Sequence, residues 1–138
     1  MPAFLRLLRL LLIDPSISHI RIRLACLAYL AILVLGSIPG ARAGIGHFAS
    51  GVVLHSLAYA GLTLLIFCGI NGSAARRAVA SVLAIAAMGA ADEFVQSFFS
   101  YRGATVGDWL VDCAAALVSA AVLYLLWPRV TLAPARVP

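Results

Sequence analysis

Four long apolar runs, separated by short polar breaks, constrain the fold of this chain more than any other feature. They cover residues 24–38, 52–70, 78–99 and 109–127. An α-helix rises about 1.5 Å per residue, so about 20 apolar residues cross the hydrocarbon core of a bilayer. The last three runs reach that length, and the first reaches it if Arg21 and Arg23 extend their side chains to the interface. We therefore predict an all-α integral membrane bundle of four transmembrane helices.

The composition agrees with a membrane protein. Hydrophobic residues make up 64% of the 138 residues, charged residues 11%, and the mean hydropathy is +1.07, outside the soluble globular range. The basic residues are all arginine and lie between the apolar runs without a nucleic-acid-binding motif, so we expect no nucleic-acid partner. Cys26, Cys68 and Cys113 lie inside apolar runs without metal-ligand spacing. We predict neither a metal site nor a cofactor.

The chain divides into three segments. Residues 1–23 are basic, and their FLRLLRLLL stretch predicts either a short interfacial helix or a frayed terminus. Residues 24–127 form the membrane domain, and residues 128–138, beginning with a proline that ends the last run, form a short tail. Small residues in the runs favour close helix packing. Those that we assign to packing are Gly61, Ala80, Ala84, Ala87, Ala115 and Ser119.

The distribution of arginines predicts the orientation of the bundle. Eight arginines fall on the side of the membrane that would hold both termini: Arg6, Arg9, Arg21, Arg23, Arg76, Arg77, Arg129 and Arg136. Only Arg42 and Arg102 fall on the other side. The positive-inside rule then places both termini in the cytoplasm, and residues 90–112 outside, for a multi-pass protein of the cytoplasmic (inner) membrane.

A cleaved signal peptide is the alternative interpretation of the first run. Basic residues precede this run, and the Ala41-Arg42-Ala43 sequence that follows it resembles a cleavage site. Residues 1–23 are long for the basic region of a signal peptide, which favours a retained helix. Cleavage would leave the other three helices in the same orientation.

Polar residues gather at the predicted outer ends of three helices. Four of the five acidic residues lie within residues 90–112. The second run carries a histidine and a tyrosine four positions apart, which places them on one helical face. The candidate ligand-pocket residues are His55, Tyr59, Asp92, Glu93, Gln96, Arg102, Asp108 and Asp112.

The energetic cost of buried charge makes this grouping informative. A charge at the centre of a membrane helix costs about 2.5–3.5 kcal/mol on insertion scales. Asp92, Glu93 and Asp112 lie about one to two turns inside their helices, so we expect them to face each other, Arg102, His55 or a wet cavity rather than lipid. A functional pocket and a structural network that locks the hairpin both account for this pattern, and Asp108 alone also fits a helix cap.

The same residues resemble the VanZ-like family of small integral membrane proteins, over about residues 24–126. The segments that carry the resemblance are HSLAY and DEFVQSFFSYRGATVGDWLVD. The family pattern has Ser-x-Pro after the first helix, His-x-x-x-Tyr in the second, Glu-x-x-Gln in the third, an arginine-containing turn, and Asp opening the fourth. The matching residues are Ser37, Pro39, His55, Tyr59, Glu93, Gln96, Arg102 and Asp108.

The sequence departs from the family pattern at several positions. Gly51 and Val52 stand where the family often has Asp-Lys, so no lysine-dependent role transfers. Asp112 stands where the family usually has Asn, which adds a charge, and Ala115 stands where it has Gly. The resemblance implies an envelope function, with the teicoplanin resistance associated with the family namesake as the analogy.

The leading hypothesis is a protein of the cell envelope that binds or alters a membrane lipid, a lipid-linked precursor or another amphiphile. Arg102 would hold a phosphate or carboxylate, while Glu93 and Asp108 fix Arg102 and His55. Tyr59 and Gln96 would add neutral hydrogen bonds.

Two alternatives remain from the sequence. One is an enzyme with His55, Glu93 and Asp108 as catalytic candidates, in which His55 is a general base or holds a divalent metal with the carboxylates. The sequence offers one candidate histidine and no recognised catalytic or metal-binding spacing, so we assign no catalytic residue. The other is a structural assembly subunit. The sequence leaves homo-oligomerisation open.

Overall fold

The computed structural model describes residues 11–40, 50–101 and 103–132, with side chains as far as residue 127. The 3-10 helix η1 (Pro15–Ile17) is followed by four α-helices: α2 (Ser18–Ser37), α4 (Gly51–Gly69), α5 (Ala74–Gln96) and α6 (Val106–Leu132). The described residues contain no strand, and each of the four helices has the length and hydropathy needed to cross a membrane. The predicted all-α class and the four apolar helices are confirmed.

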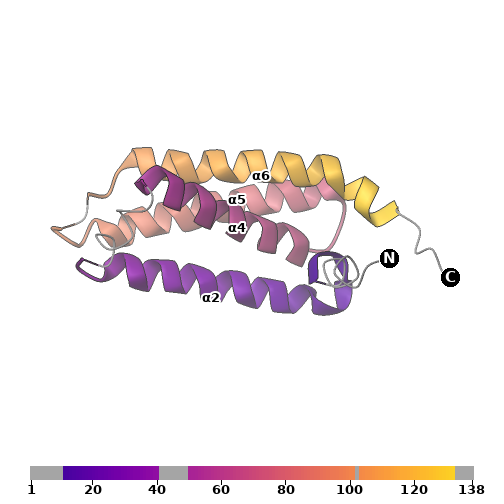
Figure 1. The fold of residues 1–138 in the computed structure, drawn as a ribbon, viewed down its shortest axis with the longest axis horizontal. Helices are drawn as coiled ribbons and strands as arrows, with labels where there is room; N and C mark the ends of the chain where they lie inside the picture. Colours follow the sequence, from indigo (N-terminus) through magenta and orange to yellow (C-terminus); the bar gives the residue numbers. More distant parts are fainter. Residues whose placement is uncertain (1–10, 41–49, 102, 133–138) are drawn as a thin grey trace.

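The four helices lie side by side and alternate in direction (Figure 1). Helix α6 packs on α4 and α5, and α2 packs mainly on α4. The start of α2 and the end of α6 therefore lie at the same end of the bundle. We call this the arginine end, after Arg21, Arg23, Arg76 and Arg77. The opposite end, with His55, Asp92, Glu93, Asp108 and Asp112, is the acidic end.

Local sequence signals set the helix boundaries. Ser50 and Ser73 are the N-caps of α4 and α5, and their side chains accept hydrogen bonds from Val53 N and Arg76 N at 3.4 and 3.3 Å. Helix α2 ends before Pro39, because the residue preceding a proline avoids helical dihedral angles, and Ile38 is extended. These caps leave short connections that hold neighbouring helices antiparallel.

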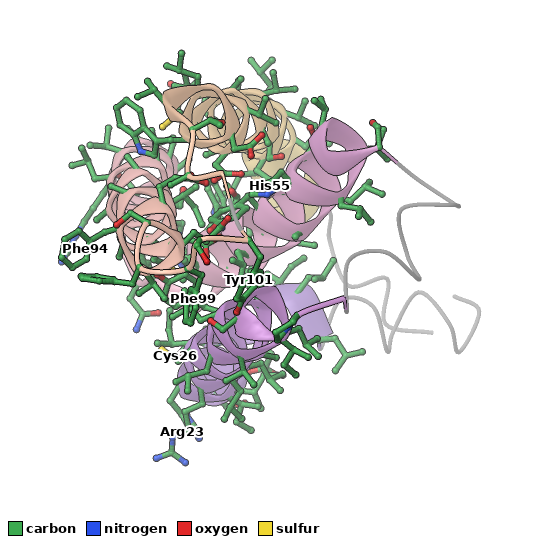
Figure 2. All side chains as sticks on the ribbon, turned by 90° about the vertical axis from the view of Figure 1, so that its left-hand side faces the viewer. Arg23, Cys26, His55, Phe94, Phe99 and Tyr101 are labelled. Carbon is green, nitrogen blue, oxygen red and sulfur yellow. The ribbon has the colours of Figure 1, made fainter. Side chains whose placement is uncertain are left out.

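Arg21 lies in the interior, which differs from the expectation that it extends to the interface. Helix α2 begins at Ser18 rather than near residue 24, and Arg21 is only 3% exposed. Its guanidinium donates hydrogen bonds of 2.7 Å each to the carbonyls of Leu11, Asp14 and Cys68. The arginine can be buried because backbone carbonyls replace its water. Arg23 remains exposed and points away from the bundle (Figure 2).

The last helix also extends further than expected, because α6 continues past Pro128 to Leu132. A proline removes one backbone hydrogen bond but its φ angle is compatible with a helix. Residues 11–13, which follow most of the FLRLLRLLL stretch, are helical. The rest of that stretch, for which an interfacial helix or a frayed terminus was expected, lies outside the described residues, as do the Ala41-Arg42-Ala43 site, Arg102 and the residues after 132.

The core of the bundle is small and the outer surface is apolar. Buried core residues come from all four helices and include Ala25, Tyr59, Leu62, Ile85 and Ala116. Large apolar side chains are exposed along every helix, for example Leu27, Leu57, Leu83 and Leu125. Buried residues also include Asp92, Gln96 and Asp112. Apolar outer faces with charge inside suit a lipid surround.

Candidate functional site

His55 and Asp112 form the central pair of the acidic end. His55 lies in the second turn of α4 and Asp112 in the second turn of α6, and the two side chains meet between the helices. His55 Nδ1 is 2.9 Å from Asp112 Oδ1, and the side chains are 12% and 0% exposed. Figure 2 shows His55 directed into the space between the helices. The bond occupies Nδ1 and leaves Nε2 as the second ring nitrogen of His55.

A second pair lies one helical turn deeper. The Tyr59 hydroxyl donates a hydrogen bond of 3.1 Å to Asp92 Oδ2, and both residues are buried. The His55 and Tyr59 rings stack, with centroids 6.0 Å apart and planes 8° apart, because their four-residue spacing places them on one face of α4. The two pairs together connect α4 to both α5 and α6.

Glu93 joins α5 to the start of α6. Its Oε2 accepts a hydrogen bond of 2.7 Å from the backbone N–H of Thr105, just before α6 begins. Thr105 Oγ1 in turn accepts from Asp108 N at 3.0 Å. Thr105 is therefore the side-chain cap of α6, and Asp108 lies in its first turn instead of capping it. Glu93 supplies the carboxylate contact to the cap N–H that a capping box normally takes from its own helix.

Two carboxylate oxygens of this cluster are buried without a hydrogen-bond partner among the described residues: Glu93 Oε1 and Asp112 Oδ2. The Asp112 oxygen lies beside Gly89 of α5. A Cβ at Gly89 would be 3.0 Å from Asp112 Oδ2 and 3.2 Å from Cδ1 of Trp109. The missing side chain at Gly89 therefore allows α5 and α6 to approach closely at the pair.

The structure brings seven of the eight predicted site residues to one end, and the eighth, Arg102, lies outside the described residues. Gln96 is buried one turn beyond Asp92, and Asp108 is partly buried one turn before Asp112. Asp112 faces His55, as expected for the deeper acids, whereas no described hydrogen bond joins His55 to Glu93 or Asp108, the two acids expected to position it. Asp108 is one turn nearer the end of the bundle, whereas Asp112 is level with His55.

Further contacts around the site were not predicted. The Tyr101 hydroxyl donates to the Ser37 carbonyl and links the α5–α6 loop to the end of α2. Tyr29 donates to the Met88 carbonyl at 2.8 Å, and Trp109 Nε1 donates to the Ala86 carbonyl at 2.9 Å. An aromatic residue with a polar tip inside an apolar run is the sequence signal for such contacts.

The described residues contain no group of three or more His, Cys, Asp or Glu side chains placed to hold a metal ion. Their geometry at the acidic end instead provides carboxylates that accept hydrogen bonds, together with one imidazole and one phenol. No family model matches the sequence, and neither a curated protein nor a solved structure matches it.

Proposed function

We propose that this chain is a VanZ-like protein of the cytoplasmic membrane that binds the polar headgroup of an amphiphile at its acidic end, facing the outer leaflet. The observation that carries the proposal is the pair of buried contacts, His55–Asp112 and Tyr59–Asp92, which gather side chains from three helices at one end of an apolar bundle. Buried ionisable residues in membrane helices commonly mark ligand or ion sites. The ligand class on this proposal is a lipid or a lipid-linked envelope precursor.

The arrangement of the opposite end supports this choice of site. Arg21 and Arg77 donate to backbone carbonyls of α4, so their charge stabilises the fold. At the acidic end, by contrast, carboxylates retain free acceptor capacity. We also propose, from the sequence alone, that Arg102 in the α5–α6 connection contacts the headgroup.

Lipid analysis of purified protein tests the proposal. A specific amphiphile should co-purify with the full chain from the native host, and its amount should fall strongly in Glu93→Ala and Arg102→Ala variants that accumulate normally in the membrane. Asp14→Asn is the matched control, because Asp14 is the only acidic residue at the arginine end. Identical lipid profiles in all four proteins would contradict the proposal. Teicoplanin susceptibility of a deletion strain carrying each variant tests the family analogy.

The outer-leaflet position requires its own test. In a variant without Cys26, Cys68 and Cys113, a single cysteine at position 102 should react with an impermeant maleimide added to intact cells. A cysteine at position 76 should react only after the cells are opened. Labelling of position 76 alone from outside would invert the proposed orientation.

A second candidate function, an enzyme acting on such an amphiphile, is favoured by the His55–Asp112 geometry. A carboxylate on Nδ1 orients the imidazole and leaves Nε2 to accept a proton, as in hydrolases that use a histidine base. The expected result is slow lipid turnover that the His55→Gln substitution abolishes. The control is His19→Gln, which should leave turnover unchanged because His19 is exposed at the arginine end. No turnover by the unmodified chain would rule out this candidate.

A further inference from the structure

The carboxylates of the acidic end outnumber the hydrogen-bond donors that the described residues bring to them. Three donors contact these carboxylates: His55, the Tyr59 hydroxyl and the Thr105 N–H. Each donor contacts a single oxygen, and Glu93 Oε1 and Asp112 Oδ2 remain without one. Asp112 is fully buried, so bulk water does not reach its second oxygen. A buried acceptor without a donor is destabilising, which indicates that a further donor belongs at this site.

The charge of the site specifies the kind of donor. Asp92, Glu93, Asp108 and Asp112 lie at the acidic end, where the only basic side chain among the described residues is His55. The described arginines, Arg21, Arg23, Arg76 and Arg77, lie at the other end of the helices. The described carboxylates therefore favour a cationic group beside them. A headgroup that is both cationic and rich in N–H donors matches the two features together.

Positions of the two unpartnered oxygens support a ligand rather than simple crowding. The bond from Thr105 N fixes one oxygen of Glu93, and the bond from His55 fixes one oxygen of Asp112. Each carboxylate is thereby held in place while its second oxygen remains an acceptor. Asp112 Oδ2 lies against Gly89, a residue without a side chain that could donate a hydrogen bond to it. Fixed acceptors of this kind bind a donor with little loss of side-chain freedom.

We infer that the acidic end binds a primary ammonium group on the headgroup of an amphiphile, with Glu93 and Asp112 accepting its N–H hydrogen bonds. The inference rests on the proposed function and narrows its ligand class, from any polar headgroup to one with N–H donors and positive charge. It leaves Arg102 to the phosphate or carboxylate of the same headgroup. Either an aminoalcohol phospholipid or an amino-sugar lipid carries the required group.

A series of amphiphiles with the same twelve-carbon chain tests the inference on the full chain in nanodiscs. Trp109, which lies beside Gly89, reports binding by its fluorescence in a Trp127→Phe background, because Trp127 lies at the arginine end. We expect dodecylammonium to bind about tenfold more tightly than dodecyltrimethylammonium, which has the same charge but no N–H, or about 1.4 kcal/mol. Dodecyl phosphate should bind more weakly than either.

Each outcome of the series has a defined meaning. Equal affinity for the two ammonium amphiphiles, or tightest binding of dodecyl phosphate, overturns the inference and leaves the proposed function standing. Binding of none of the three contradicts the proposed function as well. The source is then resolved by two pairs: ethanolamine against choline phospholipid, and dodecyl glucosaminide against dodecyl glucoside. Tighter binding of the amine-bearing lipid in at least one pair supports the inference. No preference for the amine in either pair overturns the inference.

Matched variants assign the contact to named carboxylates. Glu93→Gln and Asp112→Asn keep the shape of each side chain and remove its charge, and each should weaken dodecylammonium about tenfold or more. Asp14→Asn, the control at the arginine end, should leave the affinity unchanged. Unchanged affinity in both site variants overturns the inference even if dodecylammonium binds. The amphiphile series on unmodified protein remains decisive if either variant fails to fold.

Discussion

At the arginine end, the guanidinium groups of Arg21 and Arg77 donate to backbone carbonyls near the end of α4, whereas at the acidic end two carboxylate oxygens have no donor among the described residues. Carbonyls at a helix C-terminus lack intrahelical donors and carry partial negative charge. Arginine satisfies both needs with one side chain. Arg77 also lies over the Trp127 ring, 4.5 Å from its centroid. Carbonyl groups near the end of α4 therefore receive their hydrogen bonds from arginine side chains of the same chain.

The acidic end uses the opposite chemistry, and the comparison shows which end keeps hydrogen-bond acceptors without a described donor. A carboxylate accepts hydrogen bonds but donates none, and a helix interior offers no free N–H groups. Among the described residues, the backbone N–H group that donates to one of these carboxylates is that of Thr105, just before α6, and Glu93 accepts it. The remaining acceptor capacity has to be satisfied from outside the described chain. Variants that alter one end at a time test this difference.

The largest expected effect comes from Arg21→Met, which removes the donor from three carbonyls at the arginine end. We expect a loss of about 3 kcal/mol or more in the free energy of unfolding, since hydrogen bonds to charged groups contribute about 1.5–3 kcal/mol each. Buried Cys68, whose carbonyl Arg21 contacts, reports unfolding through its reaction with a thiol-specific dye in a variant without Cys26 and Cys113.

The matched control for that experiment is Arg23→Met, because Arg23 is exposed and points away from the bundle (Figure 2). It should change stability by less than about 0.5 kcal/mol, as is usual for surface substitutions. Similar losses in both variants would show that the number of arginines, rather than the contacts of Arg21, stabilises this end.

The second effect concerns the acidic end and is expected from Gly89→Ala. The new Cβ would meet Asp112 Oδ2 at 3.0 Å and Trp109 Cδ1 at 3.2 Å, so these packed side chains would have to shift by a few tenths of an ångström. Such overpacking costs about 1–3 kcal/mol. The rate of Cys113 labelling should rise more than the rate of Cys68 labelling, because Cys113 is the neighbour of Asp112 and the packing is loosened at the acidic end.

Gly61→Ala is the control of opposite sign. Gly61 lies in α4 with nothing within 4 Å of the added Cβ, so the substitution should stabilise the helix by up to about 1 kcal/mol. Destabilisation by both alanines would indicate a general intolerance of these helices, not a close approach at Gly89.

The fold could be predicted from the sequence because the length and hydropathy of each run are local properties. Boundaries were less accurate where arginines belong to a helix, since α5 begins at Ala74 and includes Arg76 and Arg77 before its apolar run. The burial of Arg21 could not be read from the sequence either, because one of its three carbonyl partners, Cys68, is distant in sequence. Gly61 and Ala87 were assigned to packing, but both are exposed. Small size does not reveal which face of a helix is covered.

The residues of the acidic end could also be grouped from the sequence. Helices that alternate in direction place the start of α4, the end of α5 and the start of α6 at the same end of the bundle. The pairing inside the group could not be predicted from the sequence. Whether His55 is hydrogen-bonded to Asp108 or to Asp112 depends on the offset of α6 relative to α4 along the bundle axis, and tertiary packing sets that offset. The close approach at Gly89 is likewise a property of two helices together, which no single run displays.

A smaller effect on stability, combined with a large effect on binding, is expected from Glu93→Gln and Asp112→Asn. Each substitution weakens a hydrogen bond but removes a buried negative charge, and these contributions oppose each other. The free energy of unfolding should stay within about 1 kcal/mol of the unmodified protein. A loss of several kcal/mol would instead favour the structural-subunit hypothesis, in which the acidic end only fixes helix packing.

The smallest effect is expected from Tyr101→Phe, which removes only the hydroxyl that contacts the Ser37 carbonyl. The ring keeps its contact with Phe99, whose centroid is 5.4 Å away, and Tyr101 is 49% exposed, so water competes for this hydrogen bond. We expect a loss of about 0.5 kcal/mol and faster amide hydrogen exchange confined to residues 97–101. Tyr124→Phe, an exposed tyrosine on α6, is the control and should change neither. If Tyr101→Phe instead accelerated Cys113 labelling as strongly as Gly89→Ala, the contact between the α5–α6 loop and α2 would hold the whole acidic end closed. Access of a headgroup would then depend on that loop as well as on the carboxylates.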